Sequence, residues 1–265
     1  MQIEFVRSAT LIIRTGAHQI LLDPMLADAG KLPALSVIRH KRQKNPTVPL
    51  PANTFASLKR VTAGLITHCK YGHMDHLDRA GARFLAANNV PTYCRPADAR
   101  HLAKRGIDAR PLAMGSANPF LGGQITLVPA RHGHGWIAAA MGPGVGYFIE
   151  MPGEPSLYIA GDTVLTDDVR WALTDLRPDV AIVAAGNASV DVGKPILMSL
   201  DEVMEFARLA PGRVVANHLE ALNHCPVTRA DVREAAIAKG LSDKIEIPKD
   251  GQVLTFSKEP TDERQ

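Results

Sequence analysis

The feature that most constrains this chain is a short run rich in metal-binding side chains, His68 to Asp78. It holds three of the ten histidines of the chain and two carboxylates. The run directly follows an apolar stretch, Val61 to Ile66, which predicts a buried strand that ends at Thr67. Imidazole and carboxylate groups both bind divalent transition metals. The sequence therefore predicts metal ligands at the edge of a sheet, although a solvated loop rich in histidine would look similar.

Three later apolar runs end in the same kinds of side chain. The runs cover residues 125–130, 157–160 and 214–216, and the residues that follow them include His132, Asp162 and His218. A single histidine after a strand is most often structural. Four strand ends that each carry a histidine or an aspartate favour one common metal centre.

The order of these residues resembles the metallo-β-lactamase superfamily, whose motif is Thr/Ser-His-x-His-x-Asp-His, then a His, a Gly-Asp and a last His. The matching residues here are Thr67-His68, His73-x-Asp75-His76, His132, Gly161-Asp162 and His218. The opening from Ala9 to Pro24 is similar to the first hairpin of that family, in which an aspartate, here Asp23, supports the metal loop. The Asp23-Pro24-Met25 segment and the Pro129 to His132 segment look most like one branch. That branch includes L-ascorbate-6-phosphate lactonase and the N-acyl-phosphatidylethanolamine phospholipase D group.

The resemblance implies an α/β (α+β) fold of the metallo-β-lactamase type, a four-layer αββα sandwich. We expect one domain over residues 1–258 and a frayed tail at 259–265. Helices are predicted near 78–88, 96–105, 167–176, 199–209 and 228–239, and further strands near Pro91 to Cys94 and Val180 to Ala184. Ser199 with Glu202, and Thr228 with Asp231, have the spacing of capping boxes.

The resemblance also implies two divalent metal ions, with zinc preferred and manganese or iron as alternatives. The first ion would be bound by His68, His73 and His132. The second would be bound by Asp75, His76 and His218, and Asp162 would bridge both ions.

One spacing departs from the family motif. The family has a single residue between the first two histidines, whereas Cys69 to Gly72 separate His68 from His73. Three interpretations follow. In the first, His68 still binds the metal, and the intervening residues bulge outward at Gly72. In the second, Cys69 or Tyr71 takes the place of His68 as a ligand. In the third, the first metal site is weakened or lost, and only one metal ion is bound.

The predicted chemistry is hydrolysis by a metal-bound hydroxide that attacks a carbonyl carbon or a phosphorus atom. Asp75 would also orient the hydroxide. Candidates for the general acid are His134, His224 and Tyr71. Tyr71 and Arg131 are candidates for substrate contacts. The loop from Lys31 to Asn53 carries a basic run, so it is either a solvated loop or a lip that attracts an anionic substrate.

The leading hypothesis is therefore a metal-dependent hydrolase for a small or medium ester or lactone, or for a phosphodiester. A nuclease and a true β-lactamase are disfavoured, because the chain has no room for the inserted domain of the former and no export signal of the latter. The alternatives are a non-catalytic or single-metal binding protein that retains the fold, and a di-iron redox protein.

Composition limits the partners. A formal net charge of +3 is too small to imply nucleic-acid binding. No apolar run is long enough for a transmembrane helix, and Met1 to Glu4 lack the layout of a signal peptide. The three cysteines show no metal or disulfide spacing. We therefore expect a cytoplasmic protein that acts on a small molecule. The resemblance allows a homo-oligomer, and the sequence leaves the oligomeric state open.

Overall fold

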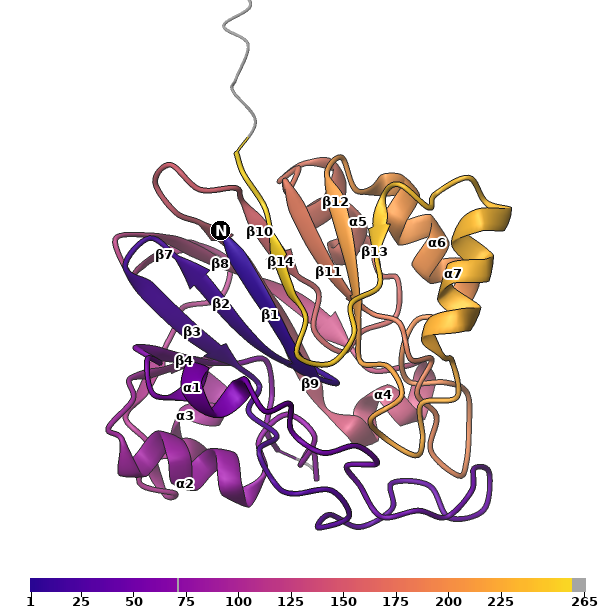
Figure 1. Ribbon diagram of the computed structural model, residues 1–265, viewed down its shortest axis with the longest axis horizontal. Helices are drawn as coiled ribbons and strands as arrows, with labels where there is room; N and C mark the ends of the chain where they lie inside the picture. Colours follow the sequence, from indigo (N-terminus) through magenta and orange to yellow (C-terminus); the bar gives the residue numbers. More distant parts are fainter. Residues whose placement is uncertain (71, 259–265) are drawn as a thin grey trace, which may run out of the picture.

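Two seven-stranded sheets lie face to face in the computed structural model, which describes residues 1–70 and 72–258 (Figure 1). The strands of the first sheet, in spatial order, are β14 (Val253–Thr255), β1 (Gln2–Arg7), β2 (Thr10–Thr15), β3 (His18–Leu22), β4 (Ala63–Ile66), β5 (Thr92–Cys94) and β6 (Ala109–Pro111). Those of the second sheet are β13 (Ile245–Glu246), β12 (Arg213–Asn217), β11 (Val180–Ala184), β10 (Leu157–Ile159), β9 (Pro143–Glu150), β8 (Gly123–Arg131) and β7 (Ala117–Phe120). The predicted tail at 259–265 and Tyr71 lie outside the described residues.

Helices cover the outer face of each sheet. The first sheet carries α1 (Thr54–Leu58), α2 (Arg79–Ala87) and α3 (Pro96–Ala103), and the second carries α5 (Asp167–Thr174), α6 (Leu200–Leu209) and α7 (Arg229–Ala238). A further helix, α4 (Gly135–Met141), lies in the lower half of the view in Figure 1. The order helix, sheet, sheet, helix confirms the predicted αββα sandwich.

The sandwich follows from strands that are apolar on both faces. Successive side chains of a strand point to opposite faces. In β2, Leu11 and Ile13 therefore pack into the core between the sheets, whereas Ile12 packs under α2 and α3. A strand that is buried on both sides needs a cover on each side, and the second sheet and the helices provide it.

Most predicted elements are present with small shifts at their ends. The strand predicted from Val61 begins at Ala63. The capping boxes of α6 and α7 are formed as predicted, with Ser199 and Thr228 as the N-caps. Helices α1 and α4 were not predicted. The N-cap of α4, His134, makes no side-chain cap hydrogen bond, so the sequence carries no start signal there.

No helix within the described ranges is both long enough and apolar enough to span a bilayer. The loop from Lys31 to Asn53 contains no helix or strand, and a single antiparallel bridge between Leu32 and Asn45 closes it.

The first turn of α2 is docked tightly against the turn that follows β3. Asp78 caps the helix by accepting a hydrogen bond from the Gly81 amide at 2.6 Å, and it also accepts one from the Ala27 amide at 2.6 Å. A β-carbon on Gly81 would lie 2.0 Å from the carbonyl oxygen of Pro24. Glycine at this position therefore permits the close contact between the helix and the turn.

We expect Gly81→Ala to destabilise the protein by about 1 to 3 kcal/mol, the usual cost of overpacking. In an unhindered helix the same change stabilises by about 1 kcal/mol, so the sign of the effect is diagnostic. The measurement is the urea midpoint of unfolding, with the exposed Arg83→Ala in the same helix as the control. A midpoint for Gly81→Ala at or above that of the wild type would contradict the contact.

Candidate metal centre

The seven residues predicted as metal ligands converge in two buried groups. The first group is His68, His73 and His132, and the second is Asp75, His76, Asp162 and His218. Within each group, one nitrogen or oxygen atom from every residue lies within 4.8 Å of the others. Four strand ends supply these residues: β4, β8, β10 and β12. The structure thus brings together side chains that lie up to 150 positions apart in the sequence.

The turn after β10 shows how the fold places one of these side chains. Gly161 has a φ of 66°, a left-handed conformation that favours glycine. A β-carbon there would lie 2.8 Å from the carbonyl oxygen of Val145. Gly161 therefore lets the chain turn sharply against β9, so that Asp162 faces the cluster.

Several nitrogen atoms in the cluster lack any hydrogen-bond partner. The Nε2 atoms of His68, His132 and His218 are buried and unpaired. An unpaired buried polar atom normally costs about 1 to 3 kcal/mol, so three of them in one cluster indicate that ligands bind there. Neutral imidazole nitrogens beside carboxylates are suitable donors for a divalent transition metal. The residues present therefore fit the metal ions that the sequence implies.

Asp162 lies in contact with both groups. Its Oδ2 atom is 3.0 Å from Nε2 of His76, 3.5 Å from Nε2 of His218 and 3.6 Å from Nε2 of His132. His132 belongs to the first group and His76 and His218 to the second. The Oδ2 atom of Asp162 is therefore placed where it could bind two ions at once.

A second layer of hydrogen bonds fixes two of the imidazole rings, those of His68 and His76. Asp23 accepts hydrogen bonds from the amide and the hydroxyl of Thr67, at 2.8 and 2.6 Å, and lies 2.8 Å from Nδ1 of His76. The hydroxyl of Thr67 is 2.9 Å from Nδ1 of His68. These partners occupy the Nδ1 atoms and leave the Nε2 atoms to face the cluster. This is the support that the resemblance implied for Asp23.

The unusual spacing between the first two histidines has a structural counterpart. His68 faces the cluster, whereas Cys69 is buried among apolar side chains that include Ile66 and Leu77. Gly72 has a φ of 88°, which suits a bulge before His73. The Nε2 atom of His73 lies 3.1 Å from the carbonyl oxygen of Met141, which leaves its Nδ1 atom for the cluster.

Burial and charge shift the proton affinities within the cluster. Burial lowers the pKa of His68 well below its usual value, and the neighbouring histidines lower it further. Burial also lowers the pKa of His73, to about 4. Burial opposes the charged form of Asp162 too, but His218 and His76 outweigh it and lower the pKa of that carboxyl. The lowered pKa values of His68 and His73 favour neutral rings, and the lowered pKa of Asp162 favours the carboxylate anion.

A cavity of about 320 Å³ opens beside the cluster. Its described lining residues are Pro33, Ala34, Leu35, Gly72, His73, Met74, Asp75, Met141, Asp162, Val190, Ile196 and His224. No lysine or arginine is among them. The predicted lip from Lys31 to Asn53 does border the cavity, but its apolar residues 33–35 do so, not its basic run.

The structure distinguishes the candidates for the general acid and for substrate contacts by whether they line the cavity. His224 is only 3% exposed and lines the cavity with Asp75. His134 is exposed at the start of α4, outside this lining. Arg131 is exposed and borders a different depression, together with Asp167. Tyr71 lies outside the described residues.

Three apolar residues of the cavity were not predicted: Met141, Val190 and Ile196. Met141 ends α4, and the other two lie in the segment between β11 and α6. They carry no motif, because only the packing of distant loops brings them to the cluster.

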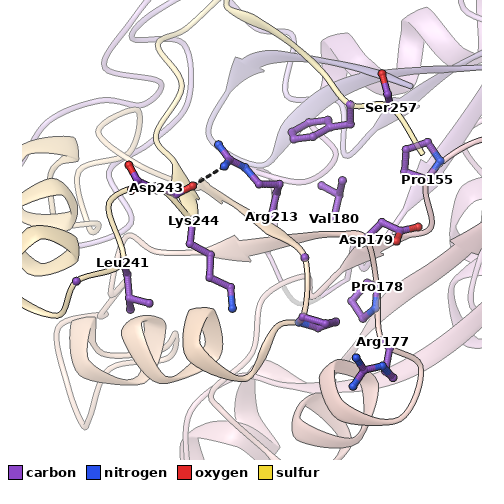
Figure 2. Close-up of a pocket in the computed structure, with 14 residues that line it drawn as sticks. Pro155, Arg177, Pro178, Asp179, Val180, Arg213, Leu241, Asp243, Lys244 and Ser257 are labelled. Atoms are coloured by element: carbon purple, nitrogen blue, oxygen red, sulfur yellow. Dashed lines mark hydrogen bonds between the residues drawn. The ribbon is translucent and has the colours of Figure 1, made fainter. Parts of the chain in front are cut away.

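A larger hollow of about 630 Å³ lies at the start of strands β11 and β12, at the end of the second sheet away from the metal-ligand cluster. Figure 2 shows Arg177, Asp179, Val180, Arg213 and Lys244 among its lining residues. Val180 and Arg213 begin the parallel strands β11 and β12, whereas Asn217, at the other end of β12, adjoins the cluster. Neither candidate group of metal ligands includes a residue of this hollow.

Comparisons with known proteins show the family to which the chain belongs. Residues 18–219 match the family model described as "Beta-lactamase superfamily domain". The UPF0173 protein YddR of Bacillus subtilis is 29% identical over 97% of this chain and all of its own length. The UPF0173 metal-dependent hydrolase of Flavobacterium johnsoniae is 25% identical over 84% of this chain and 91% of its own length.

Two solved structures are similar over nearly the whole chain. An isothiocyanate hydrolase from Delia radicum gut bacteria has a TM-score of 0.87 at 30% identity, and covers 97% of this chain and 100% of its own. A possible metal-dependent hydrolase from Veillonella parvula has a TM-score of 0.88 at 27% identity, and covers 97% and 99%. The chain belongs to the β-lactamase superfamily domain family, and it has the metallo-β-lactamase fold.

The contribution of His68 can be tested against that of its neighbour. We expect His68→Ala to lose about one of two bound metal ions, because its unpaired Nε2 faces the first group. Cys69→Ala should keep both, because the thiol packs away from the cluster. The measurement is metal content per chain by plasma mass spectrometry after purification in metal-free buffer. Loss of metal from Cys69→Ala, with full retention in His68→Ala, would contradict the geometry.

Proposed function

We propose that this protein, a metal-dependent hydrolase of the β-lactamase superfamily, cleaves a small neutral ester or lactone. The observation that carries the proposal is the cavity beside the cluster. The polar side chains among its described lining residues are His73, Asp75, Asp162 and His224, and the other described lining residues are apolar, with no lysine or arginine. The resemblance to the lactonase branch supports cleavage of a lactone, whereas the neutral charge is argued from the cavity alone.

The two groups of ligands would hold two divalent ions. His68, His73 and His132 would bind one, and Asp75, His76 and His218 the other, with Asp162 shared between them. Nitrogen and carboxylate ligands suit zinc, and the same set accepts manganese or iron. When bound, such ions lower the pKa of a coordinated water from about 15.7 towards about 7 and polarise the oxygen of an electrophile.

The side chains of the cavity then supply orientation and proton transfer. Asp75 is 4% exposed and lines the cavity, so its carboxylate can accept a hydrogen bond from the attacking water. His224 lines the same cavity and would donate a proton to the leaving oxygen. Burial opposes the charged form of His224, but Cys225 outweighs it and raises the pKa of the ring, which favours the protonated acid.

The size and charge of the cavity limit the substrate. A volume of about 320 Å³ lies at the small end of ligand sites in proteins. A phosphodiester could pair its negative charge with the two metal ions and with protonated His224, but no described lysine or arginine of the lining adds to them. A neutral carbonyl compound needs no such partner, so we rank it above a phosphodiester and above other anionic substrates.

A second candidate substrate is an isothiocyanate. The similar structure from Delia radicum gut bacteria is an isothiocyanate hydrolase, with 30% identity over nearly the whole chain. An isothiocyanate is also small, neutral and apolar, and its central carbon is attacked by water. The apolar lining from Pro33 to Leu35 and at Ile196 suits it as well as it suits a lactone.

A substrate panel separates these candidates. Zinc-loaded and manganese-loaded protein would be assayed with γ-lactones, p-nitrophenyl esters, benzyl isothiocyanate and bis-p-nitrophenyl phosphate. We expect kcat/KM for one of the neutral substrates to exceed that for the phosphodiester by at least about tenfold, which corresponds to about 1.4 kcal/mol. A preference for the phosphodiester would contradict the ranking. Bound metal with no turnover of any substrate would favour a non-catalytic protein that retains the fold. Reversible redox chemistry of bound iron would favour a di-iron redox protein.

His224→Gln should lower kcat by about 10²- to 10⁴-fold, the usual contribution of a general acid. Its metal content should stay unchanged, because His224 belongs to neither ligand group. The sign of the pH effect follows from the raised pKa: the acid is protonated below that pKa, and activity declines as the pH rises through it. The alkaline limb of the pH profile should therefore disappear in His224→Gln. A large loss in His134→Gln, with little change in His224→Gln, would contradict the assignment.

A further inference from the structure

A buried thiol lies between a predicted metal ligand and the predicted general acid. The Sγ atom of Cys225 is 3.3 Å from Nδ1 of His218 and 3.9 Å from Nδ1 of His224. Cys225 is 9% exposed and makes no disulfide. It is not among the described lining residues of the cavity, and in the proposed reaction it acts only by raising the pKa of His224.

We infer that Cys225 is a positioning residue that orients His218 toward the metal centre and links it to His224. The inference rests on the proposed function, because it treats His218 as a metal ligand. Nε2 of His218 lies 3.6 Å from Asp75 and 3.5 Å from Asp162 and has no hydrogen-bond partner. If Nε2 binds the ion, Nδ1 carries the proton and donates it to the sulfur atom of Cys225. That hydrogen bond fixes both the tautomer and the rotation of the ring.

The backbone around the thiol permits the contact between Cys225 and His218. A β-carbon on Gly186 would lie 3.2 Å from the sulfur of Cys225 and 2.2 Å from the carbonyl oxygen of His218. Gly186 therefore leaves room for the two residues to meet. The amide of Ser189 donates to the carbonyl of His224 at 2.9 Å, and the amide of Val227 donates to the carbonyl of Gly186 at 3.3 Å. The loop that carries Cys225 is thus tied to the segment after β11.

Two other ligand rings, those of His68 and His76, show the same arrangement with different partners. Nδ1 of His76 is held by Asp23, and Nδ1 of His68 by the hydroxyl of Thr67. At His218 the corresponding position is filled by sulfur. Because this sulfur also contacts the ring of His224, a change at Cys225 should affect metal binding and proton donation together.

The test compares two substitutions that keep the size of the side chain. Cys225→Val removes the acceptor and Cys225→Ser retains one. Zinc affinity would be measured by competition with a chromophoric chelator, after the fold has been checked by circular dichroism. We expect Cys225→Val to weaken the second zinc site by about 10- to 100-fold, and Cys225→Ser to stay within a few-fold of the wild type. Cys94→Val, at a buried cysteine in β5, is the matched control and should leave both sites intact.

The outcomes separate the inference from the proposed function. Two zinc sites in the wild type with equal affinities in Cys225→Val would overturn the inference and leave the proposed function standing. Equal weakening in Cys225→Val and Cys94→Val would also overturn it, because any buried substitution would then have the same effect. A wild type that binds no zinc would overturn the proposed function, and the inference with it.

Discussion

The contact of one carboxylate with two groups of histidines is the interaction on which the rest of the site depends. Asp162 reaches His132 on one side and His76 and His218 on the other through a single oxygen atom. Such a cluster is costly to bury unless cations are paired with it. The sandwich makes the burial possible, because strands of both sheets end at the cluster. Asp23 and Thr67 then hold the rings of His76 and His68 by hydrogen bonds.

Much of this arrangement could be predicted from the sequence, because its signals are local. Apolar runs that stop at a histidine or aspartate mark the strand ends, and Ser199 and Thr228 mark the starts of their helices. The convergence of those ends at one edge was available only through the resemblance to a family. Once that resemblance is granted, the positions of His68, Asp162 and His218 follow from their order along the chain.

The cavity could not be predicted in the same way. Met141 lies in a short helix with no capping signal, and Val190 and Ile196 lie in a loop with no motif. His134 and His224 are indistinguishable as candidates by type, and only tertiary packing exposes one and buries the other beside Asp75. The basic run after Lys31 suggested an anionic substrate, but the apolar part of that loop faces the cavity. The packing of the loops therefore determines the lining of the cavity and with it the substrate class, whereas the residues at the strand ends determine the metal ligands.

The most direct test of this account is the number and position of metal ions in crystals grown with zinc, measured by anomalous diffraction at the zinc absorption edge. The account predicts two peaks on either side of Asp162. One should be bound by His68, His73 and His132, and the other by Asp75, His76 and His218. A single peak, or a peak without Asp162 as a ligand, would contradict the shared carboxylate.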